Sequence, residues 1–203
     1  MSSSPQPNSP TPAELCPMCE ADRPVLHAWR NDLATLSLWY PRRAPRNPEQ
    51  FAREFQETEA STHVRFMVRA EGKAVGTVYS YNYNSLHGWA YLAVFIEAAN
   101  RRRGLGSWAA RSFAAWLFDN YPLRKLYAEV YGFNQESNAT LQAAGIRPEA
   151  VLREHLYWRG GYHDLLLYAV SREQFDETQR SLDTTARPEL AAASIHSNLR
   201  EGR

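Results

Sequence analysis

The stretch Arg101-Arg102-Arg103-Gly104-Leu105-Gly106 lies between an apolar strand pattern and a long amphipathic helix pattern. A strand that runs into a glycine-rich loop at a helix start offers unpaired backbone N–H groups and the positive end of the helix dipole, which suit a phosphate or pyrophosphate. The arginines add charge that can fork onto phosphate oxygens. We expect Gly104 to let the backbone approach the anion and Gly106 to let the first helical turn pack close to that anion.

This stretch is neither of the two best-known nucleotide-binding loops. It lacks the third glycine of the dinucleotide pattern G-x-G-x-x-G, and it lacks the Lys-Ser/Thr pair of the P-loop.

Length and composition set broad limits on the protein. The chain has 203 residues, of which 44% are hydrophobic and 22% are charged, as expected of one globular domain with tails. A net charge of +1 gives too weak a field to favour nucleic acid or a membrane surface as the partner. Because no apolar run is long enough to span a bilayer and the polar N-terminus lacks a signal-peptide core, we expect a cytoplasmic protein. A homodimer is an open alternative to the monomer.

The two cysteines, Cys16 and Cys19, form a Cys-Pro-Met-Cys pair. A structural zinc site needs four ligands, and no second Cys/His pair lies at ligand spacing. A redox pair would place its first thiol at a helix N-terminus, whereas the helix pattern begins after the pair, near Asp22. We therefore expect no metal and interpret both cysteines as packing residues at the end of a strand.

Hydrophobic periodicity and breaker residues predict the order of elements β-α-α-β-β-β-α-β-α-β-β. Residues 1–12 are rich in Ser and Pro and are expected to be a disordered tail, residues 13–181 one folded domain, and residues 182–203 a second tail. The order indicates a single α+β domain with a mixed, mostly antiparallel sheet and helices on both faces. The predicted strands are 14–18, 63–70, 74–82, 88–96, 125–131, 149–158 and 162–170; the predicted helices are 22–40, 47–60, 105–121, 137–144 and one that starts at 171.

Three motifs in order resemble those of a known family. The Arg-x-x-Gly-x-Gly form of residues 101–106 resembles the pyrophosphate loop of the GNAT N-acetyltransferases, which bind acetyl-CoA. Asn134-Gln135-Glu136-Ser137, after the next strand, resembles the motif on the CoA side of that family. Gly161-Tyr162-His163-Asp164, closing with Tyr168, is similar to the Gly-x-Tyr-x-Asp segment of the RimJ/RimL-type branch, whose members acetylate ribosomal proteins. The resemblance covers residues 13–175 and implies the GNAT fold.

The resemblance also implies a cofactor, acetyl-CoA, and the residues that hold it. The loop from Arg101 to Ser107 would bind the pyrophosphate through backbone N–H groups. Backbone N–H groups on the preceding strand, near Val94, Phe95 and Ile96, would face the thioester oxygen. By resemblance, the Asn134 side chain contacts the cofactor, and Ser137 lies near its sulfur and protonates the leaving thiolate.

The general base is where the sequence departs from the RimL type. A Glu precedes a Tyr on the family strand before the Gly-x-Tyr-x-Asp segment, but this chain has Leu156 before Tyr157. Substitutes are Glu154, which a regular strand places on the face opposite to His155, and Glu97 at the end of the strand before the loop. A water chain to solvent is a further alternative, since an α-amino group, with a pKa of about 7.7–8.0, loses its proton far more readily than a lysine, at about 10.4.

Aromatic residues on two neighbouring strands have two interpretations. They are either ordinary cross-strand packing or the lining of the groove for the acceptor amine. As a lining, they favour a small aromatic or apolar amine over a basic peptide tail. The residues are Tyr79, Tyr81 and Tyr83 on one predicted strand face and Trp89 and Tyr91 on the next, with Trp29, Trp39 and Tyr40 on the first helix closing the groove.

The sequence therefore predicts an acetyl-CoA-dependent N-acetyltransferase. Its acceptor is expected to be a small-molecule primary amine, and the transfer to run directly within a ternary complex. Two alternatives stay open: a CoA-binding regulator with the same fold that has lost transfer activity, and an acyltransferase that uses a longer acyl-CoA.

Overall fold

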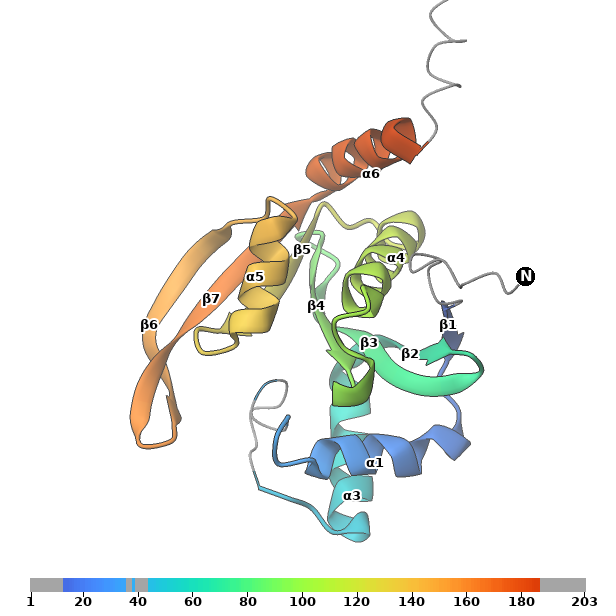
Figure 1. Cartoon of the computed structure of the whole chain (residues 1–203), viewed down its shortest axis with the longest axis vertical. Helices are drawn as coiled ribbons and strands as arrows, with labels where there is room; N and C mark the ends of the chain where they lie inside the picture. The colour runs from blue at the N-terminus through green and yellow to red at the C-terminus, as the bar shows by residue number, and fades with distance from the viewer. Residues whose placement is uncertain (1–12, 36–37, 39–43, 187–203) are drawn as a thin grey trace, which may run out of the picture.

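The structure, a computed structural model, describes residues 13–35, 38 and 44–186 (Figure 1). The predicted tail at 1–12 and the chain beyond 186 lie outside these residues. The strands are β1 (Ala13–Pro17), β2 (Thr62–Ala70), β3 (Lys73–Asn84), β4 (Trp89–Ile96), β5 (Lys125–Tyr131), β6 (Pro148–Trp158) and β7 (Gly161–Ser171). The helices are α1 (Arg23–Asn31), α3 (Pro48–Ser61), α4 (Leu105–Asn120), α5 (Gln135–Ala143) and α6 (Arg172–Ala186), with 3-10 turns η1 (Glu20–Asp22) and η2 (Ala98–Asn100).

The strands form one seven-stranded mixed sheet in the order β1-β2-β3-β4-β5-β7-β6. Every neighbouring pair is antiparallel except β4 and β5, so the predicted α+β class and element order are confirmed. No helix within the described parts of the chain is long and apolar enough to cross a membrane.

The parallel pair at the centre of the sheet is short. β4 and β5 pair only at Trp89–Lys125, Ala90–Leu126 and Tyr91–Tyr127. Beyond this point β4 continues to pair with β3 as far as Ile96, and β5 continues to pair with β7 as far as Tyr131. The two strands therefore diverge, and we call the opening between them the splay.

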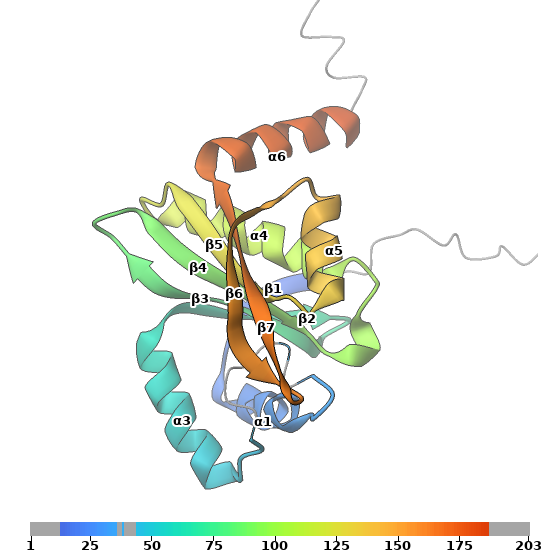
Figure 2. The same cartoon turned by 90° about the vertical axis from the view of Figure 1, so that its left-hand side faces the viewer.

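Helices cover both faces of the sheet, as predicted, and strand alternation explains how (Figure 2). On one face, α4 packs through Phe113 and Leu117 onto residues such as Val68, which is fully buried. On the other face, α1 and α3 pack onto Met67, the neighbour of Val68 on β2, and onto Phe95. Because successive side chains of a strand point to opposite faces, each strand supplies both cores. We call these the α4 face and the α1/α3 face.

The first helix is shorter than predicted. The pattern from 22 to 40 predicted one helix, but α1 ends at Asn31, and Asp32 has an extended backbone with φ −69° and ψ 105°. The Asp32 carboxylate accepts hydrogen bonds from the backbone N–H of Ala34 (3.0 Å) and the hydroxyl of Thr35 (2.9 Å). Such a local turn competes with helical hydrogen bonding and ends the helix. Residues 36–37 and 39–43, and with them Trp39 and Tyr40, lie outside the described part of the chain.

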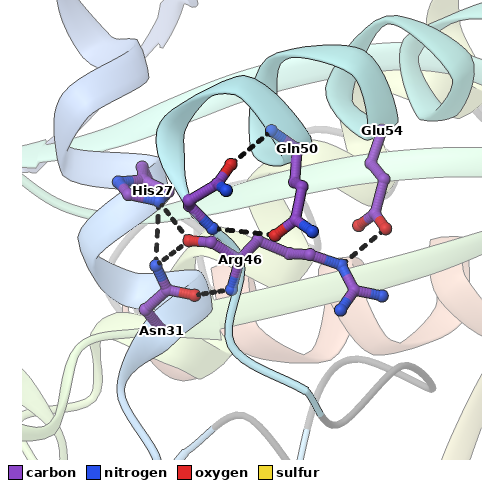
Figure 3. Close-up of polar contacts among 6 residues, drawn as sticks. His27, Asn31, Arg46, Gln50 and Glu54 are labelled. Carbon is purple, nitrogen blue, oxygen red and sulfur yellow. Dashed lines mark hydrogen bonds and ion pairs between the residues drawn. The ribbon is translucent and has the colours of Figure 1, made fainter.

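A polar network joins the end of α1 to the start of α3 (Figure 3). The Asn31 amide donates to the carbonyl oxygen of Arg46 (2.7 Å) and accepts from its N–H (2.8 Å), and His27 Nε2 lies 2.8 Å from the same carbonyl. Arg46 in turn pairs with Glu54 at 2.6 Å. These contacts fix where the chain leaves α1 and where it enters α3.

The start of α3 is the predicted one. Asn47 Oδ1 accepts from the Gln50 N–H (2.9 Å), and Gln50 Oε1 accepts from the Asn47 N–H (3.1 Å). This reciprocal pair is the capping box that the sequence predicted.

The last helix runs further than its pattern indicated. α6 continues to Ala186, past Leu182, where the tail was predicted to begin. At its start, the Arg172 guanidinium donates to the carbonyl oxygens of Phe118 (2.5 Å), Tyr121 (3.2 Å) and Leu123 (3.0 Å). Arg172 thereby satisfies carbonyls at the C-terminal end of α4 that no helical N–H reaches.

Gly76 on β3 allows the close approach of β4, and this gives a stability prediction. A Cβ at Gly76 would lie 2.3 Å from the carbonyl oxygen of Phe95. Since backbone cannot move aside as a side chain can, Gly76→Ala should lower the free energy of unfolding by about 1–3 kcal/mol. Urea unfolding followed by circular dichroism measures the change.

Gly106 supplies the matched control. A Cβ there would meet only Ile96 Cγ1 at 3.7 Å, an ordinary contact. Gly106→Ala should therefore leave stability unchanged or raise it by up to about 1 kcal/mol, through the helix propensity of alanine. Equal losses in both variants would show that the contact at Gly76 is not the cause.

Candidate active site

The splay leaves part of the β4 backbone without a neighbouring strand. The Glu97 N–H donates to the Val75 carbonyl (3.0 Å), so this N–H points toward β3. Because N–H groups alternate along a strand, that of Phe95 points the same way, and those of Val94 and Ile96 point toward the splay. Neither Val94 nor Ile96 has a paired residue on β5. Of the three residues predicted to face the thioester oxygen, these two present N–H groups to the opening.

The start of α4 has the geometry of an anion site. Gly104 is its N-cap, with φ 77° in the left-handed region, and a Cβ there would meet no atom within 4 Å. The first helical hydrogen bond runs from the Trp108 N–H to the Gly104 carbonyl (3.0 Å). The N–H groups of residues 105–107 therefore have no acceptor within the helix, as at any helix N-terminus, and this end of the helix can bind an anion.

The three arginines of the loop differ in position. Arg101 turns inward: its Nε donates to the Ile96 carbonyl (2.8 Å), and its guanidinium lies 5.9 Å from the Phe95 ring centre. Arg102 and Arg103 are exposed, with φ 61° at Arg102 and a 2.8 Å hydrogen bond from Arg103 to Asn100. Arg101 therefore fastens the loop to β4, whereas Arg102 and Arg103 stay at the surface.

Gly106 lies in the open N-terminal turn of α4. A Cβ there would meet Ile96 Cγ1 at 3.7 Å, so the protein itself leaves room for a methyl group at this position. The role predicted for Gly106, to let the first turn of α4 pack close to the anion, stays a prediction.

Asn134 and Ser137 lie at the start of α5, directly after β5. Asn134 is the N-cap, and its Oδ1 accepts from the backbone N–H of Ser137 (3.2 Å). This cap fixes both residues of the second motif relative to the end of β5. Their contacts with the cofactor stay predictions.

A buried pair that the sequence did not single out as functional anchors this helix. The Tyr168 hydroxyl donates to Asn138 Oδ1 (2.9 Å), and the Asn138 amide donates to the Tyr131 carbonyl (3.1 Å). Tyr168 is only 1% exposed. The two hydrogen bonds join α5 to β7 and to the end of β5. The sequence signal was Tyr168 as the close of the third motif, but its partner was not apparent.

Glu97, one of the two predicted substitutes for the base, has a structural role in this state. Its carboxylate accepts from Trp29 Nε1 (3.1 Å) and from the Asn100 amide (2.5 Å). Trp29 is 6% exposed and packs on Phe95 with 5.3 Å between ring centres. The pair links α1 to the loop before α4, and Trp29, predicted to close an acceptor groove, is instead buried against β4.

Glu154, the other predicted substitute, lies in an irregular part of the edge strand β6. The register shifts between Leu152 and Leu156, Glu154 has φ 48°, and its N–H donates to Asp164 Oδ1 (2.9 Å). The strand is therefore not regular here, although the predicted opposite faces of Glu154 and His155 required a regular strand, and both side chains are exposed. β7 separates β6 from β5, which places the two backbones roughly 10 Å apart.

Five aromatic side chains form a continuous row on the α1/α3 face, which we call the aromatic row. The distances between ring centres are 5.9 Å for Tyr79–Tyr81, 5.2 Å for Tyr81–Tyr91, 5.3 Å for Tyr91–Tyr127 and 5.8 Å for Trp89–Tyr91. Tyr127 of β5 was not among the predicted residues. The row crosses from β3 to β5 where the paired part of β4 and β5 ends, and so borders the splay.

Tyr83 does not belong to the aromatic row, and the shared face predicted for it is wrong. A register shift follows Tyr81, and Asn82 has φ 49°, a left-handed conformation that breaks the alternation. Tyr83 therefore packs against the α4 core and stacks on His63, with 4.1 Å between ring centres. This removes the observation on which its predicted role in substrate binding rested.

Charged groups surround the aromatic row. The Tyr81 hydroxyl donates to Glu129 Oε2 (3.0 Å). Burial, followed by the negative charge of Glu129, raises the pKa of Tyr81 and that of Tyr91, so both phenols stay protonated at neutral pH. The ends of the row carry cations: the Arg65 guanidinium lies 4.3 Å from the Tyr79 ring centre, and the Lys125 ammonium 5.1 Å from that of Tyr127.

The cysteines lie far from the splay. Cys16 is in β1, opposite Met67 of β2, and Cys19 caps η1 through its N–H and thiol, 3.0 Å and 3.2 Å from Asp22 Oδ2. Asp22 also pairs with Arg69 at 2.6 Å. Across the described ranges, no group of three or more His, Cys, Asp or Glu residues could hold a metal ion.

The fold and the site match one family. Residues 13–147, more than half of the chain, match the family described as Acetyltransferase (GNAT) domain, so this chain belongs to the GNAT acetyltransferase family. It is an N-acetyltransferase with acetyl-CoA as its cofactor. A Bacillus subtilis relative, the SPbeta prophage-derived uncharacterized N-acetyltransferase YokL, is 26% identical over 143 residues, which cover 69% of this chain and 77% of YokL.

Two solved structures share the fold. Spermidine N-acetyltransferase from Vibrio cholerae, in complex with CoA and spermine, has a TM-score of 0.73 and 17% identity, covering 80% of this chain and 97% of that one. RimL, a ribosomal L7/L12 alpha-N-protein acetyltransferase in complex with coenzyme A, has a TM-score of 0.70 and 17% identity, covering 80% and 95%. One of these enzymes is named for a polyamine and the other for a protein, so the likeness does not select the acceptor.

The open space at Gly104 predicts a charge effect that can be separated from a steric one. Gly104→Asp and Gly104→Asn add side chains of the same shape, and both residues tolerate a left-handed backbone better than other side chains. Only aspartate places a negative charge at the helix N-terminus. We expect the aspartate variant to bind CoA at least about tenfold more weakly than the asparagine variant, about 1.4 kcal/mol, with a difference that shrinks as salt is added.

Isothermal titration of CoA into the two folded variants measures the difference. Equal affinities would show that the pyrophosphate does not bind beside Gly104.

Proposed function

We propose that this protein transfers the acetyl group of acetyl-CoA to a small primary amine with one ammonium group and an apolar or aromatic body. The observation that carries the proposal is the aromatic row, which borders the splay on the α1/α3 face. The N-terminus of α4, with the loop from Arg101 to Ser107, lies on the other face. The two substrates would therefore meet at the splay from opposite sides of the sheet.

The cofactor side of the proposal rests on backbone groups. The N–H groups of Val94 and Ile96 are proposed to bind the thioester oxygen, and those of residues 105–107 the pyrophosphate. Arg102 and Arg103, being exposed, would add charge beside the phosphates. Asn134 and Ser137 are proposed to contact the cofactor near its sulfur, with Ser137 as the proton donor to the thiolate.

The acceptor side favours one cation over several. Aromatic faces attract an ammonium group, and a carboxylate, Glu129, lies beside them. However, Arg65 and Lys125 already lie over the rings of Tyr79 and Tyr127 at the two ends of the aromatic row, so these ring faces are taken and are not open to further positive charges. A monoamine therefore fits this surface better than a polyamine such as spermine. The aromatic lining and Leu156 in place of the RimL-type Glu argue against a protein N-terminus.

Direct transfer is favoured because the described site offers no activated nucleophile for a covalent intermediate. Both cysteines of the chain lie at the β1 edge of the sheet, and three strand spacings, roughly 14 Å, separate β1 from β4. Ser137 has no histidine among its described hydrogen-bond partners to activate it.

A panel of amines tests the acceptor class. We expect free thiol to be released from acetyl-CoA with 2-phenylethylamine at a kcat/KM at least about tenfold above that for spermine or for a peptide N-terminus, because only the first combines one charge with an aromatic body. Initial rates at several concentrations of both substrates should give intersecting lines, as for a ternary complex.

Other outcomes have clear meanings. A preference for spermine would contradict the monoamine, and parallel lines would indicate a covalent acetyl-enzyme. If the protein binds CoA but releases thiol with none of the amines, the alternative of a CoA-binding regulator without transfer activity would be supported. The same assay with butyryl-CoA measures the tolerance for a longer acyl chain.

A further inference from the structure

We propose that the Glu129 carboxylate binds the ammonium group of the acceptor and takes its proton. The inference rests on the proposed function, because it concerns the acceptor amine at the same site. It differs from the substitutes that the sequence suggested, since Glu129 belongs to none of the three motifs.

The position of Glu129 is the first argument. It lies on β5 two residues beyond Tyr127, the last residue of β5 that pairs with β4. Strand alternation places Glu129 on the same face as Tyr127, and its hydrogen bond to Tyr81 confirms that this is the α1/α3 face. The carboxylate therefore stands at the mouth of the splay, on the side from which the acceptor is proposed to enter.

The surroundings of Glu129 are the second argument. Glu129 is exposed, and its described hydrogen bond uses only Oε2, from the Tyr81 hydroxyl at 3.0 Å. The cations that lie against the rings of the aromatic row are Arg65 and Lys125. Lys125 already pairs with Glu149 at 2.6 Å, and Arg65 lies over Tyr79 at the far end of the aromatic row. An ammonium group of the acceptor would therefore give the Glu129 carboxylate a charged hydrogen-bond donor in addition to the neutral Tyr81 hydroxyl, beside the aromatic rings.

The other acids and bases near the splay are less suitable. The Glu97 carboxylate is occupied by Trp29 and Asn100. Glu154 lies two strands away from β5, on β6, and its N–H contacts Asp164 of β7. The β7 residue that pairs with Glu129 is Leu167, three residues further along that strand. Glu154 is therefore displaced from Glu129 both across the sheet and along the strands. Tyr81 and Tyr91 stay protonated because burial raises the pKa of each, so they donate rather than accept a proton.

The transfer replaces the C–S bond of the thioester with a C–N bond and moves two protons from the amine. An alkylamine arrives as an ammonium ion at neutral pH, since such groups have a pKa of about 10. One N–H proton moves to the Glu129 carboxylate and frees the nitrogen lone pair, which attacks the thioester carbonyl carbon. The C–N bond forms and the C–S bond breaks, so that CoA leaves as a thiolate. The Ser137 hydroxyl gives its proton to the thiolate and is reprotonated by the second proton of the nitrogen, and Glu129 returns the first proton to solvent.

Glu129→Gln tests the proposal with two amines of similar shape. The probes are 2-phenylethylamine and its β,β-difluoro analogue, whose ammonium is far more acidic and needs little help to lose a proton. At pH 7 the variant should lower kcat/KM for 2-phenylethylamine by about 10²–10⁴ and for the analogue much less. The dissociation constant of CoA should stay unchanged, because Glu129 lies on the other face from the α4 N-terminus.

Three variants accompany this test. Glu71→Gln removes the same charge from the exposed β2–β3 turn and should change nothing. Tyr81→Phe removes the donor that holds Oε2, so a positioning role predicts a rise in KM of about three- to tenfold with a smaller change in kcat. Glu154→Gln examines the rival acid. Equal losses on both amines in Glu129→Gln, or a loss in Glu154→Gln instead, would overturn the inference.

A binding measurement does not depend on turnover. With CoA present, Glu129→Gln should weaken the binding of 2-phenylethylammonium by about tenfold and leave the uncharged 2-phenylethanol unaffected. Equal affinity for the ammonium in both proteins would contradict the inference. If the wild type is active and Glu129→Gln releases thiol just as fast, the role of Glu129 is overturned and the proposed function stands. If the wild type is inactive on every amine, the proposed function is overturned.

Discussion

The divergence of β4 and β5 is the constraint on which the rest of the structure depends. Two parallel strands that separate after three residue pairs leave backbone polar groups without partners, and such groups cannot be buried without cost. The sheet tolerates the divergence because the other edge of each strand stays paired: β4 with β3, and β5 with β7, over the full length of the opening. The N–H groups of Val94 and Ile96 then need an acceptor from elsewhere, which the thioester oxygen of acetyl-CoA can supply.

The two faces of the sheet present different groups to the splay. α4 and α5 share one face, where Tyr168 and Asn138 fix α5 to β7 and to the end of β5. The Asn134 cap therefore has a fixed position relative to the splay, and so has the loop before α4, which Arg101 fastens to the Ile96 carbonyl. α1 and α3 cover only part of the other face, around Phe95 and Met67, and leave the aromatic row farther along the strands beside Glu129.

Local signals were enough to predict most of the fold, because each depends on neighbours in the chain. The capping box at Asn47 and Gln50, the glycine at the start of α4 and the hairpin between β6 and β7 all appear where their residues indicated. The misses come from residues whose conformation breaks a regular pattern. Asn82 turns Tyr83 to the α4 face, and the turn at Asp32 ends α1 early, although the apolar spacing continues.

The site was less predictable than the fold, because its acids are sorted by contacts between distant parts of the chain. The sequence suggested Glu97 and Glu154 because both lie beside known motifs. Nothing local distinguishes Glu129, an exposed charge in an alternating strand, and its place becomes clear only when the register brings Tyr81, 48 residues earlier, within hydrogen-bonding distance. A pattern in one segment cannot report a contact that the pairing of β3, β4 and β5 creates.

A base on β5 also accounts for the leucine at position 156. A carboxylate on β6 must reach toward β5 across β7, and its reach depends on the irregular register around Glu154. Glu129 is instead held by a strand that pairs along its whole length with β7 and that leads directly into the Asn134 cap. If Glu129 on β5 takes the proton of the acceptor, the residue at position 156 has no proton to accept, and a leucine can stand there.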